Sequence, residues 1–460
     1  MVILPYWQMA MISDWDIGIK AQSVLEKQVN MLLPPLFPLN RSISGSGLRK
    51  TLNTLKKITD FDIIEIPSGT KCFDWTIPEE WNVKEAYIED LKGEKIIDFK
   101  KNNLHLVNYS TAQDNIYTFD QLKKHLHTLP NMPDAIPYRT SYYQKSWGFC
   151  FAYDDLKKFK KTQKYHVKID ASFRNGSITM GEKKICGKSK KTFLITTYAC
   201  HPSMANDNLS GLILWILLLK TLSSRKTHYS YKFIIGPETI GAIAFLSKNK
   251  KLLKDVIGGF VLATLGGSGK FGYKQTYLGD HLIDSVIKKS FKDLNVDFIT
   301  YPFDLNGSDE RQYSSPFFRI PMASVTKDKY YEYPAYHTSK DDLSFVKSSH
   351  IISSLKIYLK IIENLENSKI YISTQPKCEP MLSKRGLYPK IGGSFNPKGI
   401  KGNTIYGYDV KEINTIRALL FWSDGESSLE QISQKTGVPI TRLFEATKKL
   451  ENINLLKEVK

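Results

Sequence analysis

The feature that most constrains the fold is an alternation of strand-length and helix-length apolar runs over about 200 residues in the middle of the chain. Strands are expected at residues 193–198, 231–235, 259–265, 298–301 and 322–325. Helices are expected at residues 209–222, 240–247, 282–294 and 348–365. This alternation is typical of an α/β domain, in which helices cover a sheet.

The segments on either side differ in character and suggest further domains. Residues 1–60 read as a helical part of the α/β domain, which then runs over 166–370. Residues 61–165 are rich in aromatic side chains and in short strand-like pieces separated by turns, which favours a β-rich insert. Residues 371–408, with many Pro and Gly, read as a linker. Residues 409–460 hold three helical patterns and read as a winged helix.

Membrane insertion and export are not expected. The longest apolar run, residues 212–219, is far shorter than the ~20 residues that cross a bilayer. The N-terminus is apolar but has no basic leading segment and carries Pro5 and Asp14, so a helix from about Asp14 is preferred to a secretory signal. The five cysteines are scattered without a CxxC pair, which fits a reducing cytoplasm.

The formal charge of +19 leaves several partners open: nucleic acid, an anionic membrane surface or an acidic substrate. However, 55 of the 65 basic residues are Lys, whereas specific phosphate and base recognition draws on the planar fork of Arg. We therefore favour lysine on solvated faces as the explanation.

Chemistry-bearing side chains follow the expected strands. In open α/β sheets, ligands bind at the carboxyl ends of strands. Two histidines and three acids lie after strands or beside helix starts, and all could reach one edge of the sheet: His201, Asp207, Glu238, Asp309 and His337. Any one of them has a structural explanation, such as a helix cap for Asp207. Their joint occurrence suits zinc, which accepts imidazole and carboxylate ligands and leaves a position for water.

The motifs around these residues resemble a known family. The series CHPSMANDNLSG, PETIG, GSDERQYSSP and YPAYHTSKDDL is similar to bacterial aminopeptidase-like proteins, which are related to the co-catalytic zinc exopeptidases. The resemblance covers nearly the whole chain, including GTKCFDWTIPEEWNVKEAYI and LPNMPDAIPYRTSYYQKSWGFC in the insert and KRGLYP in the linker. It implies a three-layer α/β/α zinc-exopeptidase-like domain with a mixed sheet, a small β-rich insert and a C-terminal winged helix.

The resemblance also implies roles for the five residues. His201 matches the first zinc-binding histidine, and Asp207 matches the aspartate that bridges two metals. Glu238 matches the general base. Asp309 matches the carboxylate ligand that follows a serine, and His337 matches the last ligand.

Two departures from the family pattern leave the metal count open at one or two zinc ions. Thr239 stands where the exopeptidases carry a second glutamate, which binds the second metal. Ser203 stands where an acid usually follows the first histidine. The glutaminyl cyclases, which are similar in fold, work with a single zinc, so one ion is compatible with catalysis.

Other residues near these motifs have two readings each. Arg311 either clamps a substrate carboxylate or pairs with Glu310 or Asp341. Tyr331, Tyr333 and Tyr336 either polarise a substrate carbonyl or pack the loop, and packing is favoured. Two neighbouring acids either orient His337 or cap a helix: Asp341 and Asp342.

The preferred prediction is a cytoplasmic zinc metallopeptidase of the aminopeptidase type, which hydrolyses a peptide or other small amide with Glu238 as the base. One alternative is a winged-helix binding or regulatory protein on a peptidase-like scaffold, with nucleic acid as an open partner. Another is metal-dependent acyl or amide chemistry on a modified sugar or other small molecule. A homo-oligomer is left open.

Overall fold

The computed structural model describes residues 15–388 and 410–459. The chain divides into two units, which are described separately. The first includes the chain as far as Gly279 together with Ser290–Lys360, and the second includes Asp280–Lys289 and the chain from Ile361 onward.

An eight-stranded mixed sheet forms the centre of the first unit. Its strands, in spatial order, are β1 (Asp62–Pro67), β10 (Ser177–Ile185), β12 (Ser230–Gly236), β11 (Thr192–Tyr198), β13 (Val256–Leu262), β16 (Met322–Thr326), β14 (Phe271–Lys274) and β15 (Phe298–Tyr301). The four central strands, β12, β11, β13 and β16, are parallel to one another. The expected mixed α/β architecture is therefore confirmed.

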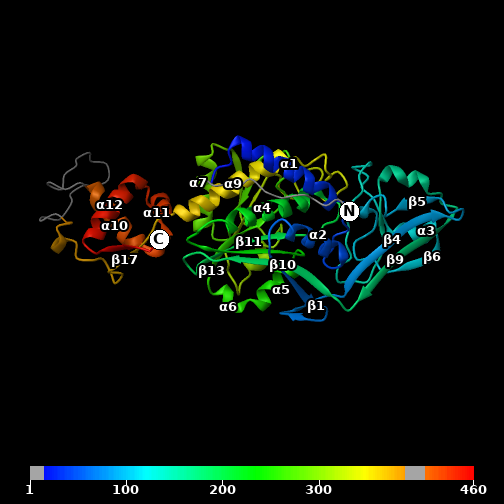
Figure 1. Ribbon diagram of the computed structural model, residues 1–460, viewed down its shortest axis with the longest axis horizontal. Helices are drawn as coiled ribbons and strands as arrows, with labels where there is room; N and C mark the ends of the chain where they lie inside the picture. Colours follow the sequence, from blue (N-terminus) through cyan, green and yellow to red (C-terminus); the bar gives the residue numbers. More distant parts are fainter. Residues whose placement is uncertain (1–14, 389–409, 460) are drawn as a thin grey trace, which may run out of the picture. The chain divides into compact units, whose positions relative to one another are not determined.

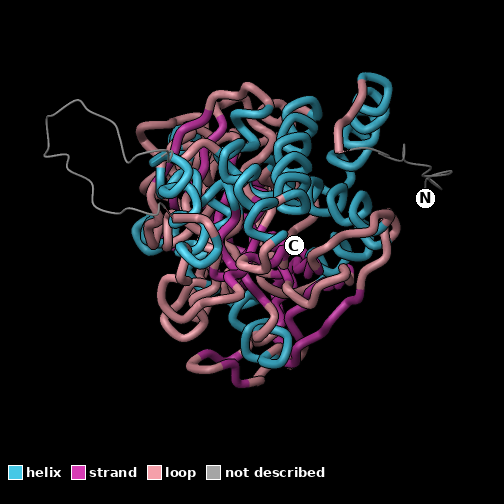
Figure 2. Tube along the Cα trace, turned by 90° about the vertical axis from the view of Figure 1, so that its left-hand side faces the viewer, coloured by secondary structure: helices cyan, strands magenta, loops and turns pink. Residues whose placement is uncertain are grey.

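Helices cover both faces of this sheet, as Figure 1 shows with α4 and α9 on one side and α5 and α6 on the other. The tube view separates strands and helices by colour (Figure 2). The helices that include residues of this unit are α1 (Ile19–Leu36), α2 (Ser46–Lys56), α4 (Gly211–Ser223), α5 (Ile240–Lys248), α6 (Lys250–Leu253), α7 (Leu282–Asp293), α8 (Glu310–Tyr313) and α9 (Ser348–Asn367).

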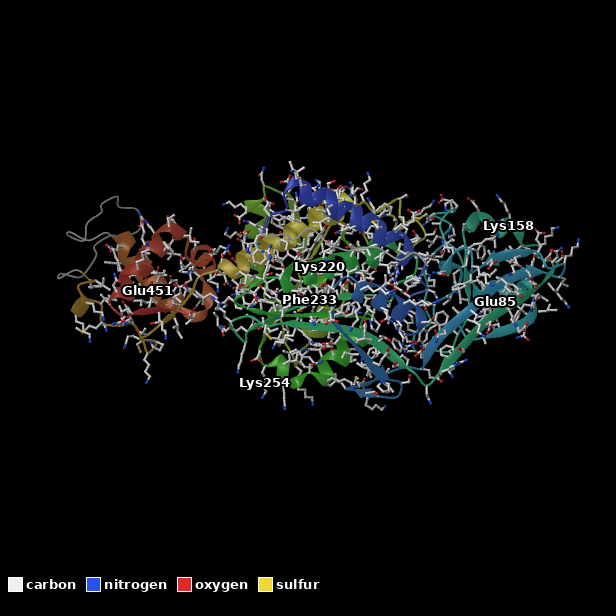
Figure 3. The ribbon with its side chains drawn as sticks, in the orientation of Figure 1. Glu85, Lys158, Lys220, Phe233, Lys254 and Glu451 are labelled. Carbon is white, nitrogen blue, oxygen red and sulfur yellow. The ribbon has the colours of Figure 1, made fainter. Side chains whose placement is uncertain are left out.

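The apolar run that the sequence places at residues 212–219 forms the buried centre of α4. Trp215 donates its indole N–H to the carbonyl of Ile195 in β11, at 3.1 Å, and packs edge-on against Phe233 of β12. Phe233 lies inside the molecule, whereas Lys158 and Lys254 point outward (Figure 3). A helix that is apolar on all sides belongs in a core, and here it anchors the sheet from one face.

The direction of β15 departs from the expected arrangement. β14 is antiparallel to β16, and β15 is parallel to β14, so β15 runs opposite to the four central strands. Its carboxyl end therefore lies at the other edge of the sheet. The chain must return before it reaches Asp309, which does not sit directly at a strand end as expected. A four-residue strand carries no sequence signal for its direction.

The β-rich insert has a four-stranded antiparallel sheet in the order β5 (Lys95–Asp98), β4 (Glu80–Asp90), β9 (Lys164–Arg174) and β6 (Gln113–Thr118). Short pieces complete it: β2 (Lys71–Cys72), β3 (Trp75–Thr76), α3 (Phe119–Leu122), β7 (Leu126–His127) and β8 (Phe149–Cys150). Its borders differ from the expected 61–165, because β1 pairs in the main sheet and β9 continues to Arg174.

The second unit contains the winged-helix fold. Its elements are β17 (Ile370–Ser373), α10 (Val410–Trp422), β18 (Asp424–Ser428), α11 (Leu429–Thr436), α12 (Ile440–Asn452) and β19 (Leu456–Glu458). A capping box between Ser428 and Gln431 starts α11, and Gly437 ends it in a left-handed conformation. The expected linker at 371–408 lies outside the described residues from 389 onward, and its first residues belong to β17.

Over residues 15–388 and 410–459, no helix combines the length and apolarity that a bilayer crossing needs. All five cysteines are free thiols.

Candidate metal centre

The first two candidate ligands come from the end of β11 and the loop that follows it. His201 is buried three residues after β11 ends, and the fully buried Arg41 donates its Nε–H to the His201 carbonyl at 2.9 Å. Asp207 lies in the next loop, where the backbone N–H groups of Asn206 and Asp207 both donate to the Asp341 carboxylate. Hydrogen bonds from outside β11 thus fix both backbones.

The third candidate, His337, follows β16 and is held by the insert. The N–H of Tyr138 donates to the His337 carbonyl at 2.8 Å, and Pro137 forms a β-bridge with Thr338. The N–H of Ser339 donates to the carbonyl of Ile136, also at 2.8 Å. This short pairing between residues 136–138 and 337–339, which we call the insert clamp, carries His337 to the sheet edge.

These three side chains converge. His337 Nε2 lies 3.0 Å from Asp207 Oδ2, yet it is buried without a partner in hydrogen-bond geometry. The other Asp207 oxygen accepts a hydrogen bond from the Tyr198 hydroxyl at 2.6 Å. One donor atom from each of His201, Asp207 and His337 lies within 4.8 Å of the others. Two imidazole nitrogens and a carboxylate oxygen that lie this close together are what a shared cation would explain.

Electrostatics give His201 and Asp207 the protonation states that a metal requires. Burial lowers the pKa of His201 to about 4, so its imidazole is neutral at neutral pH. Burial alone would raise the pKa of Asp207, but the two histidines and Tyr198 lower it to about 2. Neutral imidazole and ionised carboxylate are the ligand forms of both groups.

Glu238 lies beside this cluster at the end of β12. Its Oε2 is 3.9 Å from His201 Nε2, and its side chain is 26% exposed. Its backbone N–H donates to the Cys200 sulfur at 3.3 Å. Burial, followed by the charges of Asp309 and Asp207, raises the pKa of Glu238. Cys200, His201 and Glu238 also bring donor atoms within 4.8 Å of one another, so Glu238 borders the cluster on the side of His201.

Asp309 is not brought into either group of converging donors. Its Oδ1 accepts a hydrogen bond from the N–H of Thr239 at 2.7 Å, which places the carboxylate next to Glu238. Burial raises its pKa. The prediction that Asp309 binds the metal therefore stays a prediction, and its position supports a second role, as a neighbour that disfavours the charge on Glu238.

Of the three predicted substrate-binding residues, Tyr336 packs directly against the cluster. Arg311 is exposed, forms no ion pair with a described residue, and donates to the carbonyl of Leu305 at 3.3 Å. Its charge still lowers the pKa of both Glu238 and Asp309, although burial outweighs it. The Tyr336 ring stacks on His337 with centroids 3.9 Å apart, and Tyr331 packs on Tyr336 at 4.9 Å.

Three residues that contact the cluster were not singled out from the sequence. Tyr138 lies against both histidine rings, with centroids 5.1 Å from His201 and 5.2 Å from His337. The Tyr198 hydroxyl donates a hydrogen bond to the Asp207 carboxylate, and Arg41 donates one to the His201 carbonyl. Tyr198 ends a buried strand three residues before His201, which is a usable signal. No local pattern marks Arg41 or Tyr138, because Arg41 lies 160 residues from His201, and Tyr138 lies 63 residues from His201 and 199 from His337.

The donor set fits zinc. Two imidazoles and one carboxylate match three-ligand catalytic sites that keep a fourth position for water. In the described part of the chain, His, Cys, Asp and Glu donors gather in just the two groups above, and both include His201. Thr239, where the family pattern has a glutamate, offers its backbone N–H to Asp309.

Comparison with known proteins relates this arrangement to earlier structures. Residues 30–368 match a family model described as "Domain of unknown function (DUF4910)", and residues 369–458 match a winged helix-turn-helix model, HTH_47. The chain is 42% identical over 436 residues to a Clostridium acetobutylicum protein named "Putative polysaccharide biosynthesis protein with aminopeptidase-like domain". The match covers 94% of this chain and 96% of that protein.

Solved structures agree. A crystal structure from Clostridium acetobutylicum, titled "putative peptidase", superposes with a TM-score of 0.77 at 40% identity, covering 96% of this chain and 98% of that one. BSAP, a zinc aminopeptidase from Bacillus subtilis, gives 0.55 at 13% identity, covering 76% and 96%. The first unit therefore has the fold of a zinc aminopeptidase, and the expected resemblance to aminopeptidase-like proteins is confirmed.

Proposed function

The chain belongs to the family of the DUF4910 domain and is aminopeptidase-like, and from that premise we propose that it is a zinc-dependent amide hydrolase. The metal ligands in this proposal are His201, Asp207 and His337, and the general base is Glu238. One observation carries it: three donor atoms converge within 4.8 Å, and the His337 nitrogen among them is buried without a hydrogen-bond partner.

The chain's own residues have separable tasks in this reaction. When bound, zinc would supply a Lewis acid that polarises the amide carbonyl and acidifies a water. The Glu238 carboxylate accepts a proton from the attacking water as the C–O bond forms. It then delivers that proton to the amide nitrogen as the C–N bond breaks, which releases the amine. The Tyr198 hydroxyl holds the Asp207 carboxylate, and the Asp341 carboxylate holds the backbone N–H groups of Asn206 and Asp207 throughout.

We propose a single metal ion. Thr239 and Ser203 replace the two acids that the two-metal pattern carries, and Asp309 lies with Glu238. Metal analysis of the purified protein tests this count, and we expect one zinc per chain. In H337Q we expect most of the zinc to be lost on dialysis, since the remaining imidazole and carboxylate make an incomplete site.

Hydrolysis of a dipeptide series tests the catalytic part. We expect E238Q to retain zinc and to lose a factor of about 10² to 10⁴ in kcat, the usual contribution of a general base. The matched control is E332Q, which makes the same change at an exposed glutamate that pairs with Lys329. Full activity in E238Q, or hydrolysis by zinc-free protein, would contradict the proposal.

A second candidate substrate is an amide on a modified sugar. It is supported by the name of the 42% identical relative, which refers to polysaccharide biosynthesis. The same metal and base would hydrolyse an N-acyl sugar by the same steps. Parallel assays on N-acetylhexosamines and dipeptides distinguish the two substrate classes, because both are followed through the amine that is released.

A further inference from the structure

Glu238, the proposed general base, lies on a very short turn that joins a strand to a helix. Strand β12 ends at Gly236 and helix α5 begins at Ile240, so the whole connection is Pro237–Thr239. Connections of this kind in α/β domains usually have two to six residues. A turn this short leaves the chain few ways to change its direction, so its backbone geometry determines where the Glu238 side chain points.

The last residue of the turn, Thr239, has an unusual backbone conformation, with a φ of 63° and a ψ of −71°. The N–H of Ile240 donates to the carbonyl of Glu238 at 2.7 Å, which closes a γ-turn of the rare, strained form with positive φ. Glycine adopts positive φ values readily, whereas a β-branched residue such as threonine seldom does. The turn therefore carries strain that a glycine at this position would not have.

Neighbouring groups hold the turn in this form. The Thr239 N–H donates to Asp309 Oδ1 at 2.7 Å, and the Glu238 N–H donates to the Cys200 sulfur at 3.3 Å. The Thr239 carbonyl accepts from the N–H of Ile243 at 3.0 Å, in the first turn of α5. With the γ-turn bond, all four backbone N–H and carbonyl groups of Glu238 and Thr239 are paired. Backbone strain persists where the surrounding structure holds it in this way, and it gathers at active sites.

Two glycines allow close packing on either side of the turn. A Cβ on Gly241 would lie 3.1 Å from the Pro237 ring, and a Cβ on Gly236 would lie 3.1 Å from the Met180 side chain. The segment GPETIG is therefore similar in geometry to the nucleophile elbow of α/β-hydrolases, where a sharp, strained strand-to-helix turn between glycines presents a serine. In this chain the residue that the turn presents is a carboxylate.

We propose that Thr239 is a positioning residue, whose strained backbone fixes the Glu238 carboxylate where it takes the proton from the attacking water. This inference rests on the proposed hydrolase function, in which Glu238 moves that proton to the amide nitrogen. Placement matters, because a displacement of about 1 Å can lower the rate of a positioned reaction about 100-fold. A glycine at position 239 would form the same turn without strain, but it would also populate other conformations and hold the base less firmly.

The test compares T239A with T239G in the full-length, zinc-loaded protein. Neither variant has the threonine side chain, but T239A keeps the strained φ and T239G relieves it, so we expect T239G to melt about 2 °C above T239A. We expect kcat on the best of the dipeptides and N-acetylhexosamines to be at least tenfold lower in T239G than in T239A, with KM within threefold. A variant that is more stable and yet slower is not what a merely structural role predicts.

The matched control is the pair T54A and T54G, at a helical position in α2, which carries none of the site residues. There the order should reverse, with glycine melting below alanine, and kcat should be equal in the two variants. Because kcat is expressed per bound zinc, loss of metal cannot imitate a misplaced base. A T239A variant that melts at or above T239G, or equal kcat in the two, would overturn the inference alone. If wild type cleaves neither substrate class, the hydrolase proposal fails and the positioning role fails with it, while the melting temperatures still decide whether the turn is strained.

Discussion

Replacing Asp341 by alanine should loosen the metal centre and destabilise the first unit. The buried Asp341 carboxylate accepts hydrogen bonds from the N–H groups of Asn206 and Asp207, at 2.5 and 2.9 Å, and from the Tyr333 hydroxyl at 3.0 Å. D341A leaves these three donors without their acceptor. The backbone hydrogen bond from Ala205 N–H to the Asp341 carbonyl does not depend on the side chain and should keep the loop near its place.

The size of the effect follows from the three bonds. Burial raises the pKa of Asp341 to about 7, so at neutral pH each bond contributes between the about 0.5–1.5 kcal/mol of a neutral pair and the about 1.5–3 kcal/mol of a charged one. Buried donors left unpaired add their desolvation cost. Because the three share one acceptor, we expect a loss of about 4–6 kcal/mol in the free energy of unfolding of the first unit rather than a simple sum. Since two of the donors fix the Asp207 backbone, we expect zinc affinity to fall about 10- to 100-fold.

The assay is zinc competition with a chromophoric chelator at neutral pH. D342A is the control: the adjacent aspartate also accepts three hydrogen bonds, from Ser344 N–H, the Ser344 hydroxyl and Phe345 N–H. None of these reaches the loop that carries Asp207. Zinc binding as tight in D341A as in wild type, or equally weakened in both variants, would refute the reasoning.

Three further predictions concern other parts of the chain. His166 bonds Glu89 and Asp114, at 2.8 Å each, and these bonds raise its pKa, with Tyr87 and Lys168 also nearby. The stability that the charged His166 contributes to the folded state should be fully present below about pH 6.5 and lost as the pH rises through its raised pKa. The melting temperatures of wild type and H166N should therefore differ more at pH 6 than at pH 9. A Cβ on Gly47 would lie 1.9 Å from the carbonyl oxygen of Asn40, so G47A should lower the free energy of unfolding, measured by chemical denaturation, by at least ~2 kcal/mol. G18A, at a glycine with open space around it, should lower the free energy of unfolding by less than ~1 kcal/mol. Residues 410–459 hold seven basic and seven acidic residues and therefore carry no excess of positive charge. We expect this unit to bind a duplex DNA probe with a Kd no lower than about 10⁻⁶ M at 150 mM salt in an anisotropy titration. Nanomolar binding would show instead that the winged helix recognises DNA.

The sequence predicts the parallel part of the sheet well, because each strand there is a continuous apolar run. The ranges expected at 193–198 and 231–235 differ from β11 and β12 by no more than one residue at each end. The antiparallel strands at the edge of the sheet are less predictable. The sequence of β1 fits the insert equally well, and its partner β10 is more than 100 residues away. Pairing over such a distance leaves no periodic signal in either strand.

The difference between parallel and antiparallel strands also explains which residues of the site can be predicted from the sequence. His201, Asp207, Glu238 and His337 all follow parallel strands, whose carboxyl ends share one edge, so strand order alone brings them together. Asp309 follows the reversed β15, and it reaches Glu238 rather than the three converging donors. Asp341 was considered as a partner of His337, but it holds the Asn206–Asp207 backbone instead.

The insert clamp has a consequence for folding. The His337 carbonyl and the two residues after it pair with residues 136–138, and the Tyr138 ring lies against both histidines. We therefore expect the insert to be folded and docked before His337 reaches Asp207. A ligand that needs this geometry binds the docked state alone, so zinc should stabilise the docking of the insert as well as the loops that carry the ligands. The inserted domain is in this sense a structural part of the metal centre, because its residues 136–138 hold the backbone that carries His337.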